Sequence, residues 1–553
     1  MDRVNALLWL VVYITVCWSV MSWAVVDLKT LPQEENKIAD TVDPWGLAFG
    51  DQVTRFQSHF IKTPDSSFVV GYTHNLVKVW QNKYWFRGMT FCGKEDSVPA
   101  PIYAVSGSTA SFQIAVLPKT GAASADYKVE VTSPLSSRVY REEFVKTGTV
   151  AYPTFVSDSW PDPLIADNIC SLSGLNTGVF LIEVKIPSDF TASSLKCNVK
   201  VTSGASSIAF DVPINVVKLD IKPNAFPLVA WFNKGNLTDK QFDEMCQMAL
   251  ENHLQPLIQS FLYDLWKAGG EQKFAEYVQM LIDHGQTVFQ VAQMDDDLYK
   301  CLKTRKWLSK FMIYSNVDEP GDETFQTQNV HWAAETRKKY PILRIYLASE
   351  HHQNMDKGCD IWLTDISSSQ YDPRTFKNPA KPDLWHYYCH LPVNFQQRAP
   401  LVKAPNMQID NPALEQRLAL WMSWYYGAKG VFIYMGNGEW KDPEAFWKSL
   451  NISDLNSPYA YPYGGVHHGN GFLAYPPTSA EGRVIPSLRM KILRDAVEDL
   501  AIFEAIKAKY GKAAAGILNP NPEVFSHPHY FDSLPETLLE KREKILKWVE
   551  GKG

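Results

Sequence analysis

Apolar and polar positions follow two different rhythms along the 553-residue chain. From about residue 50 to 220, short alternating or β-branched runs are separated by clusters of Gly, Ser, Pro and Asp, a pattern typical of antiparallel strands. These runs cover residues 67–72, 76–80, 110–117, 127–132, 179–186, 195–202 and 210–219. We therefore predict an antiparallel β-sandwich in this part of the chain.

Beyond a turn-rich linker at 221–227, short apolar runs alternate with amphipathic stretches of helical length, as in a parallel sheet wrapped by helices. The apolar runs lie at 228–232, 255–259, 287–292, 311–316, 343–348, 360–364, 384–388 and 430–435. Eight strands fit one closed (β/α)8 TIM barrel, which carries its catalytic groups at the C-terminal ends of the strands. An open doubly wound sheet is the alternative, but its Gly-rich fingerprint is missing after the first strand.

Two helical stretches follow the barrel strands. Residues 486–506 carry apolar positions at helical spacing, and a last helix is predicted after Ser533, where Ser-Leu-Pro-Glu has the spacing of a capping box. The predicted α/β organisation is a signal peptide at 1–24, a β-sandwich domain with an N-terminal extension at 25–220, a (β/α)8 catalytic barrel at 228–510 and a C-terminal helical extension at 511–553.

The first 24 residues have the features of a secretory signal. Arg3 precedes an apolar run, and a small-x-small triplet ends at Ala24. The alternative is an uncleaved N-terminal membrane anchor, because the run approaches the roughly 20 residues that span a bilayer. Asn236 and Asn451 begin N-glycosylation sequons. We expect a secreted protein or one in the lumen of the secretory pathway.

The cysteines and charges exclude several classes of function. No C-x-x-C spacing, zinc-protease motif or nucleotide-binding loop occurs, so no metal or cofactor is expected. Cys170 and Cys197 lie in the β-rich region and are a candidate disulfide in an oxidising compartment. The formal net charge of -6 gives no basic excess for phosphates, so nucleic acid is not an expected partner.

The acidic pair Asp318 and Glu319 stands where the fourth barrel strand ends. Adjacent carboxylates repel each other when both are ionised, so one of them is expected to keep a proton that can be donated to a glycosidic oxygen. A helix cap is an equally good interpretation from position alone, because acidic residues also favour helix N-termini.

Several segments resemble glycoside hydrolase family 123. The resemblance includes the strand with its acidic pair, the runs 419–440 and 469–506, and Trp160–Ile165 in the β-rich region. It implies a β-N-acetylgalactosaminidase with an N-terminal β-sandwich and a catalytic barrel. In that family scheme Glu319 is the general acid and base, and Asp318 holds the N–H of the substrate's 2-acetamido group, whose carbonyl oxygen attacks C1. Val317 and Met435 depart from the family pattern.

Five further side chains are candidates for contact with a glycan substrate: Tyr314, Asn316, Trp385, Tyr387 and Trp440. Residues two apart on a strand share a face, so Tyr314, Asn316 and Asp318 are expected to line one side of the site. Trp385 has an alternative position in the barrel core.

Two other functions compete with this interpretation. A double-displacement β-glycosidase would use Glu319 as the acid and Glu439 or Glu350 as the nucleophile, about 5 Å away. The third hypothesis is a catalytically inactive carbohydrate-binding protein on an enzyme scaffold.

Overall fold

The structure is a computed structural model that describes residues 66–552. It leaves out residues 82–88, 94–97, 120–123, 147–158, 175, 350–354, 367–381, 390–403, 439–446, 448–468, 470–472 and 480. The predicted signal peptide and the sequon at Asn451 therefore lie outside the described residues. Among the described residues, no helix combines the length and the apolar character needed to span a bilayer.

Two mainly antiparallel sheets form the N-terminal part of the chain. One contains, in spatial order, β2 (Thr90–Cys92), β1 (Phe68–Thr73), β4 (Thr109–Pro118), β9 (Gly178–Lys185), β6 (Ser137–Lys146) and β7 (Ser159–Ile165). The other contains β3 (Ile102–Val105), β11 (Ser206–Val217), β10 (Ser194–Ser203), β5 (Ala125–Thr132) and β8 (Ile169–Leu172). Apolar residues of both sheets, such as Phe112 and Val199, share one buried cluster.

The predicted strands in this region are confirmed with one exception. Residues 76–80 form no strand, although Leu76, Val77 and Val79 are buried. The Nζ of the buried Lys78 donates to the backbone oxygen of Ile409, so this segment packs on the C-terminal half of the chain. The apolar residues of this segment reflect its burial and not a strand.

The eight predicted barrel strands are all present in one parallel sheet. They are β13 (Leu254–Leu257), β12 (Leu228–Trp231), β19 (Val431–Met435), β18 (Asp383–Tyr388), β17 (Ile361–Thr364), β16 (Arg344–Ala348), β15 (Phe311–Tyr314) and β14 (Phe289–Gln290), in spatial order. Because β12 pairs with β19, the first and last strands meet, and the barrel is closed except between β13 and β14.

Side-chain amides join β13 to β14 where backbone pairing is missing. Gln255 Oε1 accepts hydrogen bonds from the backbone N–H groups of Thr287 and Val288, at 2.8 and 3.0 Å. Gln286 Nε2 donates to the backbone oxygens of Pro256 and Val288. Pro256 has no N–H to donate to a neighbouring strand, so the two buried glutamines take the place of the ladder here.

Replacing Gln255 by Leu is expected to lower the free energy of unfolding by about 2 kcal/mol or more, because buried N–H groups lose their acceptor. The measurement is urea unfolding followed by circular dichroism. Gln279→Leu is the control, since Gln279 makes only an exposed contact with Asp283 on a barrel helix. Equal unfolding midpoints for the two variants would contradict this role of Gln255.

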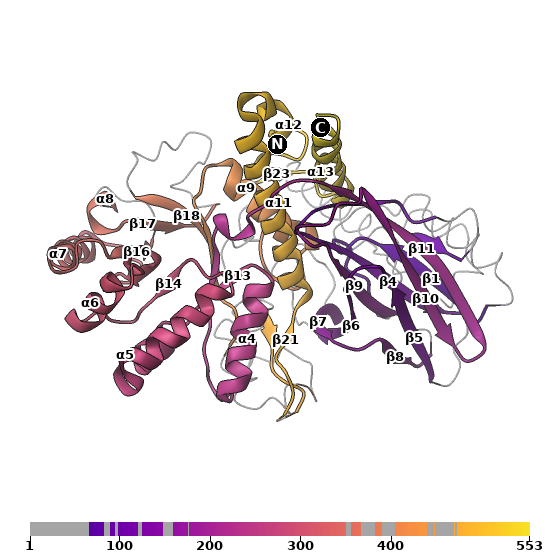
Figure 1. Cartoon of the computed structure of the whole chain (residues 1–553), viewed down its shortest axis with the longest axis horizontal. Helices are drawn as coiled ribbons and strands as arrows, with labels where there is room; N and C mark the ends of the chain where they lie inside the picture. The colour runs from indigo at the N-terminus through magenta and orange to yellow at the C-terminus, as the bar shows by residue number, and fades with distance from the viewer. Residues whose placement is uncertain are drawn as a thin grey trace, which may run out of the picture.

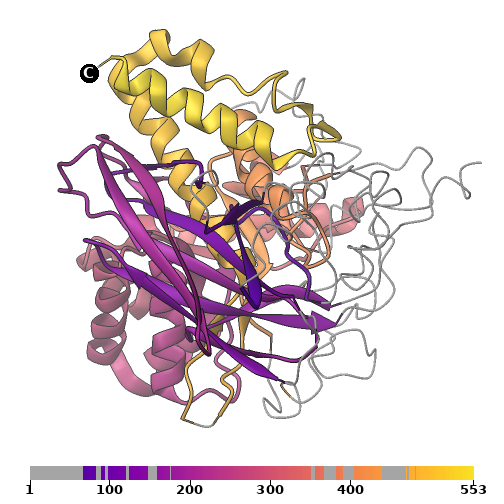
Figure 2. The same cartoon turned by 90° about the vertical axis from the view of Figure 1, so that its right-hand side faces the viewer.

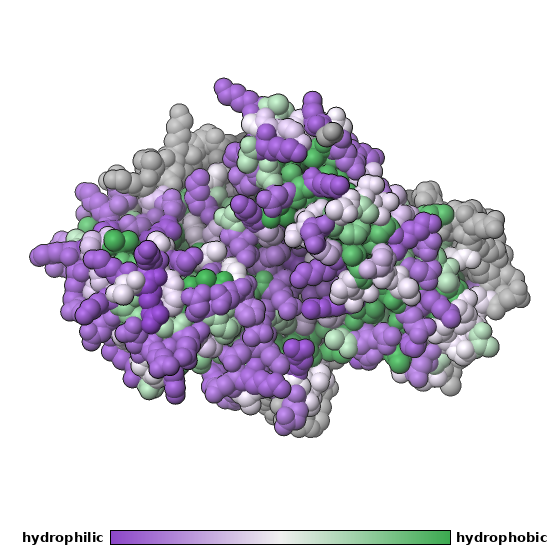
Figure 3. Space-filling model, in the orientation of Figure 1, coloured by the Kyte–Doolittle hydropathy of each residue, from purple (hydrophilic) through white to green (hydrophobic). Residues whose placement is uncertain are grey.

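Helices cover the outside of the barrel (Figure 1). They are α4 (Asp239–Glu251), α5 (Gln259–Asp283), α6 (Asp296–Thr304), α7 (Glu323–Lys339), α8 (Met355–Gly358) and α9 (Ala413–Tyr425). α4 begins with a capping box, in which Thr238 and Gln241 satisfy each other's backbone N–H. Hydrophilic residues cover the barrel helices on the face seen in Figure 3.

A long helix, α11 (Leu488–Tyr510), lies between the barrel and the N-terminal sheets (Figure 1). We predicted one apolar face, but every residue from Leu488 to Phe503 is buried. Its cations meet anions of the sheets: Arg489 binds Asp162 at 2.9 Å, and Lys491 binds Glu183 at 3.1 Å. Buried charges are tolerated only when they are paired, so these contacts fix how the two parts of the chain fit together.

The remaining elements are short, apart from one C-terminal helix. They are η1 (Pro223–Ala225), η2 (Leu308–Lys310), β20 (Ala474–Tyr475), β21 (Ile485–Pro486), η3 (Gly511–Ala514), α12 (Ala515–Leu518), β22 (Phe525–His527), β23 (Tyr530–Phe531) and α13 (Pro535–Glu550). α12 and α13 gather beside the C-terminal end of α11 (Figure 2). The predicted capping box at Ser533 is wrong, because Leu534 is the N-cap of α13 and makes no side-chain cap bond.

The predicted disulfide between Cys170 and Cys197 is also wrong, since both are free, buried thiols. β5 lies between their strands, with Cys170 opposite Tyr127 and Cys197 one residue beyond the partner of Thr132. At about 3.3 Å per residue, this register places them roughly 20 Å apart along the sheet. A disulfide requires Cα atoms about 4.4–6.8 Å apart.

Candidate active site

The acidic pair lies in the loop that leaves β15 at the C-terminal mouth of the barrel. Asp318 and Glu319 are both exposed, while the following Pro320 is buried. Glu319 has a φ of 42°, in the left-handed region that residues other than glycine rarely adopt. Such strained residues gather at functional sites, where the surrounding structure holds them.

Buried contacts hold the start of this loop. The backbone N–H of Ser315 donates to the backbone oxygen of Tyr346 on β16, at 2.9 Å. Its hydroxyl donates to Oδ1 of the fully buried Asn329 on α7 and accepts from the backbone N–H of Val317. The chain is therefore anchored three residues before Asp318.

The structure separates the acidic pair from the helix cap. α7 is capped by Asp322, whose Oδ1 accepts from the backbone N–H of Phe325 at 3.0 Å. Neither Asp318 nor Glu319 occupies that N-cap position. The alternative interpretation of the pair as a helix cap is thus wrong. The residue that caps the helix, Asp322, follows the acidic pair in the same loop.

Tyr314 holds Asp318. Its hydroxyl donates a hydrogen bond to Asp318 Oδ1, across one turn of the loop. Burial, followed by this bond and the charge of Asp318, raises the pKa of Tyr314 well above its usual value. The phenol therefore stays protonated and remains a donor to the carboxylate. Tyr314 was predicted to contact substrate, but the described contact is with Asp318.

Aromatic rings surround this point on the inner face of the barrel. Trp231 packs edge-on against Tyr314, with ring centroids 6.1 Å apart, and against Phe432 and Tyr434. Tyr346 packs beneath Tyr314, with centroids 4.8 Å apart. The mouth of the barrel therefore combines flat apolar surface with the two carboxylates, as sugar-binding sites do.

Tyr387 belongs to the same group. It is half-buried on the inner face of β18 and packs edge-on against Phe432. Burial is the main cause that raises its pKa, and Cys389, Tyr314, Tyr434 and Glu319 add to the effect. Tyr387 thus lies near both Tyr314 and Glu319, where a substrate contact is expected.

Trp385 lies in the core of the barrel and not at the site, so its predicted contact with substrate is wrong. Only 2% of its surface is exposed, and its ring leaves no room for a Cβ at Gly430, just before β19. It shares the inner face with Tyr387 but lies closer to the N-terminal end of the barrel, in its core. Asn316 is exposed in the loop beside the pair. Trp440, Glu439 and Glu350 lie outside the described residues.

The prediction from sequence missed two residues of this group. Gln290 on β14 is fully buried, and its Oε1 accepts from the indole N–H of Trp231 at 2.6 Å. Tyr434 on β19 contacts Trp231. The sequence could have indicated Gln290, because it is a polar residue at the end of a barrel strand. It could also have indicated Tyr434, because residues two apart on a strand share a face and Phe432 points inward.

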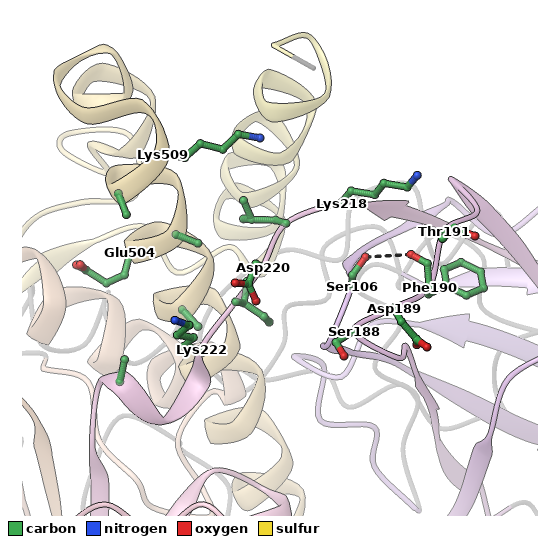
Figure 4. Close-up of a pocket in the computed structure, with 16 residues that line it drawn as sticks. Ser106, Ser188, Asp189, Phe190, Thr191, Lys218, Asp220, Lys222, Glu504 and Lys509 are labelled. Atoms are coloured by element: carbon green, nitrogen blue, oxygen red, sulfur yellow. Dashed lines mark hydrogen bonds between the residues drawn. The ribbon is translucent and has the colours of Figure 1, made fainter.

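A large groove of the described surface lies elsewhere, between α11 and the N-terminal sheets (Figure 4). It has a volume of about 1090 Å³. It is lined by Lys218, Asp220 and Lys222, which lie between β11 and η1, and by Glu504 and Lys509 of α11. None of the candidate site residues lines this groove, so it is separate from the acidic pair.

An α/β barrel with a carboxylate pair at its C-terminal mouth is an arrangement that glycoside hydrolases use. The family model for the catalytic domain of glycoside hydrolase 123 matches residues 196–506. The chain belongs to glycoside hydrolase family 123, and it is a glycosidase by that membership. No curated protein matches the chain.

Among solved structures, the chain is similar to a family 123 glycoside hydrolase from Clostridium perfringens, described in a study of glycolipid glycan hydrolysis. The two are 11% identical with a TM-score of 0.61, over 88% of this chain and 98% of that chain. A GH2 β-galacturonidase from Eisenbergiella tayi also matches, with 10% identity, a TM-score of 0.26 and 76% of each chain covered.

Proposed function

We propose that this glycosidase removes β-linked N-acetylgalactosamine, or a related N-acetylhexosamine, from glycans by a retaining, substrate-assisted mechanism. The observation that carries the proposal is the contact between Tyr314 and Asp318 beside the exposed Glu319, at the mouth of the barrel. The family of the chain supports it, as does the glycolipid glycan hydrolysis named for the similar Clostridium perfringens protein.

In the first step, Glu319 donates its proton to the glycosidic oxygen as the bond from that oxygen to C1 breaks. The carbonyl oxygen of the substrate's 2-acetamido group attacks C1 and forms an oxazolinium ion. Asp318 accepts the N–H of this group and stabilises the positive charge that develops on it. No protein nucleophile is needed, which makes this scheme an exception to the usual pair of catalytic carboxylates.

In the second step, the Glu319 carboxylate takes a proton from water, and the water oxygen attacks C1. The bond from C1 to the acetamido oxygen breaks, so the acetamido group is restored and Glu319 is protonated again. Two inversions at C1 give net retention of configuration.

Tyr314 prepares Asp318 for this role. Because one carboxylate oxygen accepts the phenol, the other oxygen remains for the substrate N–H. A hydrogen bond to an ionised acceptor is stronger than one between neutral groups, so the carboxylate is oriented before substrate arrives.

The test compares two aryl β-galactosides that differ only at C2, one with an acetamido group and one with a hydroxyl. We expect kcat/KM to be larger for the acetamido substrate by at least about 10²-fold, since the attacking oxygen is absent from the other. Comparable hydrolysis of both, or a glycosyl ester trapped on Glu439 or Glu350, would sink the proposal in favour of double displacement.

We also propose that the two N-terminal sheets constitute a β-sandwich domain and that the protein enters the secretory pathway. The shared apolar cluster between the sheets supports the first point. Asn236 is exposed in the loop before α4, which suits a glycosylated asparagine. A shift in electrophoretic mobility after glycosidase treatment of the secreted protein tests the second point.

A further inference from the structure

Gln290 connects to the candidate site through a chain of side chains. It is fully buried at the end of β14, where its Oε1 accepts from the indole N–H of Trp231 at 2.6 Å. Its Nε2 donates to Oε1 of Gln259 at the start of α5. Both ends of the amide are therefore occupied, which fixes its orientation and makes it an acceptor toward Trp231.

Trp231 transmits this constraint to Tyr314. The indole is half-buried, and its edge packs on the Tyr314 ring at an interplanar angle of 89°. Tyr346 packs on the same ring, with centroids 4.8 Å apart. Burial raises the pKa of Tyr346, a hydrogen bond with Trp231 opposes this rise, and the charge of Asp318 adds to it. Tyr314 is thus held between two aromatic residues, and its hydroxyl is aimed at Asp318.

The indole N–H is the decisive group in this arrangement. A buried N–H without an acceptor is costly, so loss of the Gln290 acceptor would favour a different tilt of the indole against the Tyr314 ring. Gln290 satisfies this N–H inside the barrel. Trp231 is consequently held with its ring edge against Tyr314, whose hydroxyl donates to Asp318.

We propose that Gln290 is a positioning residue, which sets the orientation of the Asp318 carboxylate through Trp231 and Tyr314. The inference rests on the proposed function, because it concerns the group that Asp318 binds. Gln290 touches neither substrate nor a reacting atom, so its effect is expected in the transition state, where the acetamido group becomes charged.

The experiment compares Gln290→Leu with Gln286→Leu. Gln286 is an equally buried glutamine, but it bonds only to the backbone of Pro256 and Val288. We expect Gln290→Leu to lower kcat and kcat/KM equally, by about 10- to 100-fold per folded molecule, because a small misplacement of a catalytic group is costly. Gln286→Leu should lose stability and keep the kcat of its folded fraction.

A double-mutant cycle with Trp231→Phe distinguishes positioning from a purely structural role. Phenylalanine has no indole N–H, so Gln290→Leu should lower kcat little further in the Trp231→Phe background. Gln290→Glu retains the acceptor oxygen, so its kcat should be higher than that of Gln290→Leu. If the leucine variant does not fold, the double-mutant cycle is measured with the glutamate variant. Additive losses in kcat, or a wild-type kcat in Gln290→Leu, overturn the inference.

The outcome is separable from that of the proposed function. If wild-type enzyme hydrolyses substrates with and without the acetamido group equally well, the substrate-assisted mechanism fails, whatever Gln290 does. If the acetamido group is required and the two substitutions are additive, only the role of Gln290 fails.

Discussion

Glu319→Gln is expected to lower kcat on an aryl N-acetyl-β-galactosaminide by about 10²- to 10⁴-fold, the usual contribution of a positioned acid and base. Glutamine has no proton that it can donate to the glycosidic oxygen. The loss should be smaller for an aryl group that leaves without protonation, such as dinitrophenolate. Steady-state kinetics with two leaving groups of different acidity measure this dependence.

Asp318→Asn should behave differently in the same assay. Its carboxylate acts on the acetamido group, so the loss in kcat should be similar for good and poor leaving groups. Asp322→Asn is the matched control, because it removes a charge from the same loop and asparagine is also a good N-cap. Full activity of Glu319→Gln with the poor leaving group would show that another group supplies the proton.

The barrel could be predicted from sequence because each strand is a short apolar run bounded by polar turns, and the runs from 228 to 435 all became strands. The position of the acidic pair followed from the end of the fourth strand. The sequence did not separate Asp318 and Glu319 from a helix cap, because Asp322 supplies that cap within the same short acidic stretch.

The depth of a side chain inside the barrel could not be predicted from the sequence, and this limited the prediction of aromatic substrate contacts. Trp385 and Tyr387 share one face of β18, and alternation along a strand gives the face but not the distance from the mouth. Trp385 lies in the core and Tyr387 near Glu319, as burial and the raised pKa of Tyr387 indicate. Gln290 was missed because its partner, Trp231, is 59 residues away along the chain.

α11 illustrates a second limit. Its apolar positions at helical spacing predicted one buried face, and charged residues are rarely fully buried. The anions that pair with its cations, Asp162 and Glu183, come from strands more than 300 residues earlier. A single sequence gives no means of matching such distant partners, so the predicted amphipathic helix proved to be buried on all sides.

Glu142 is a buried carboxyl group near the same interface and has no such partner. It is 2% exposed on β6, and neither carboxylate oxygen has a hydrogen-bond partner within the described part of the chain. Burial, and then the nearby charge of Asp162, raise the pKa of Glu142 from 4.5 to about 8. In the folded protein this side chain is therefore a neutral acid at pH 7.

Glu142→Gln is consequently expected to stabilise the protein, and the gain should grow as the pH rises. The raised pKa means that the folded state retains a proton that the unfolded state releases above pH 4.5. The contribution of Glu142 to the free energy of unfolding is therefore fully present below pH 4.5. It is lost progressively up to about pH 8, by at most about 1.4 kcal/mol per pH unit. Glutamine has no proton to lose.

Urea unfolding of both proteins between pH 4 and pH 8 measures the difference in free energy, expected to be near zero at the acidic end and roughly 2–4 kcal/mol at pH 8. Glu143→Gln is the matched control, because the adjacent Glu143 faces the other side of β6 and pairs with Arg141 at 2.8 Å. A stability difference for Glu142→Gln that stays constant with pH would mean that Glu142 is ionised in the folded protein. In that case a cation must compensate its charge at the interface between the sheets and α11.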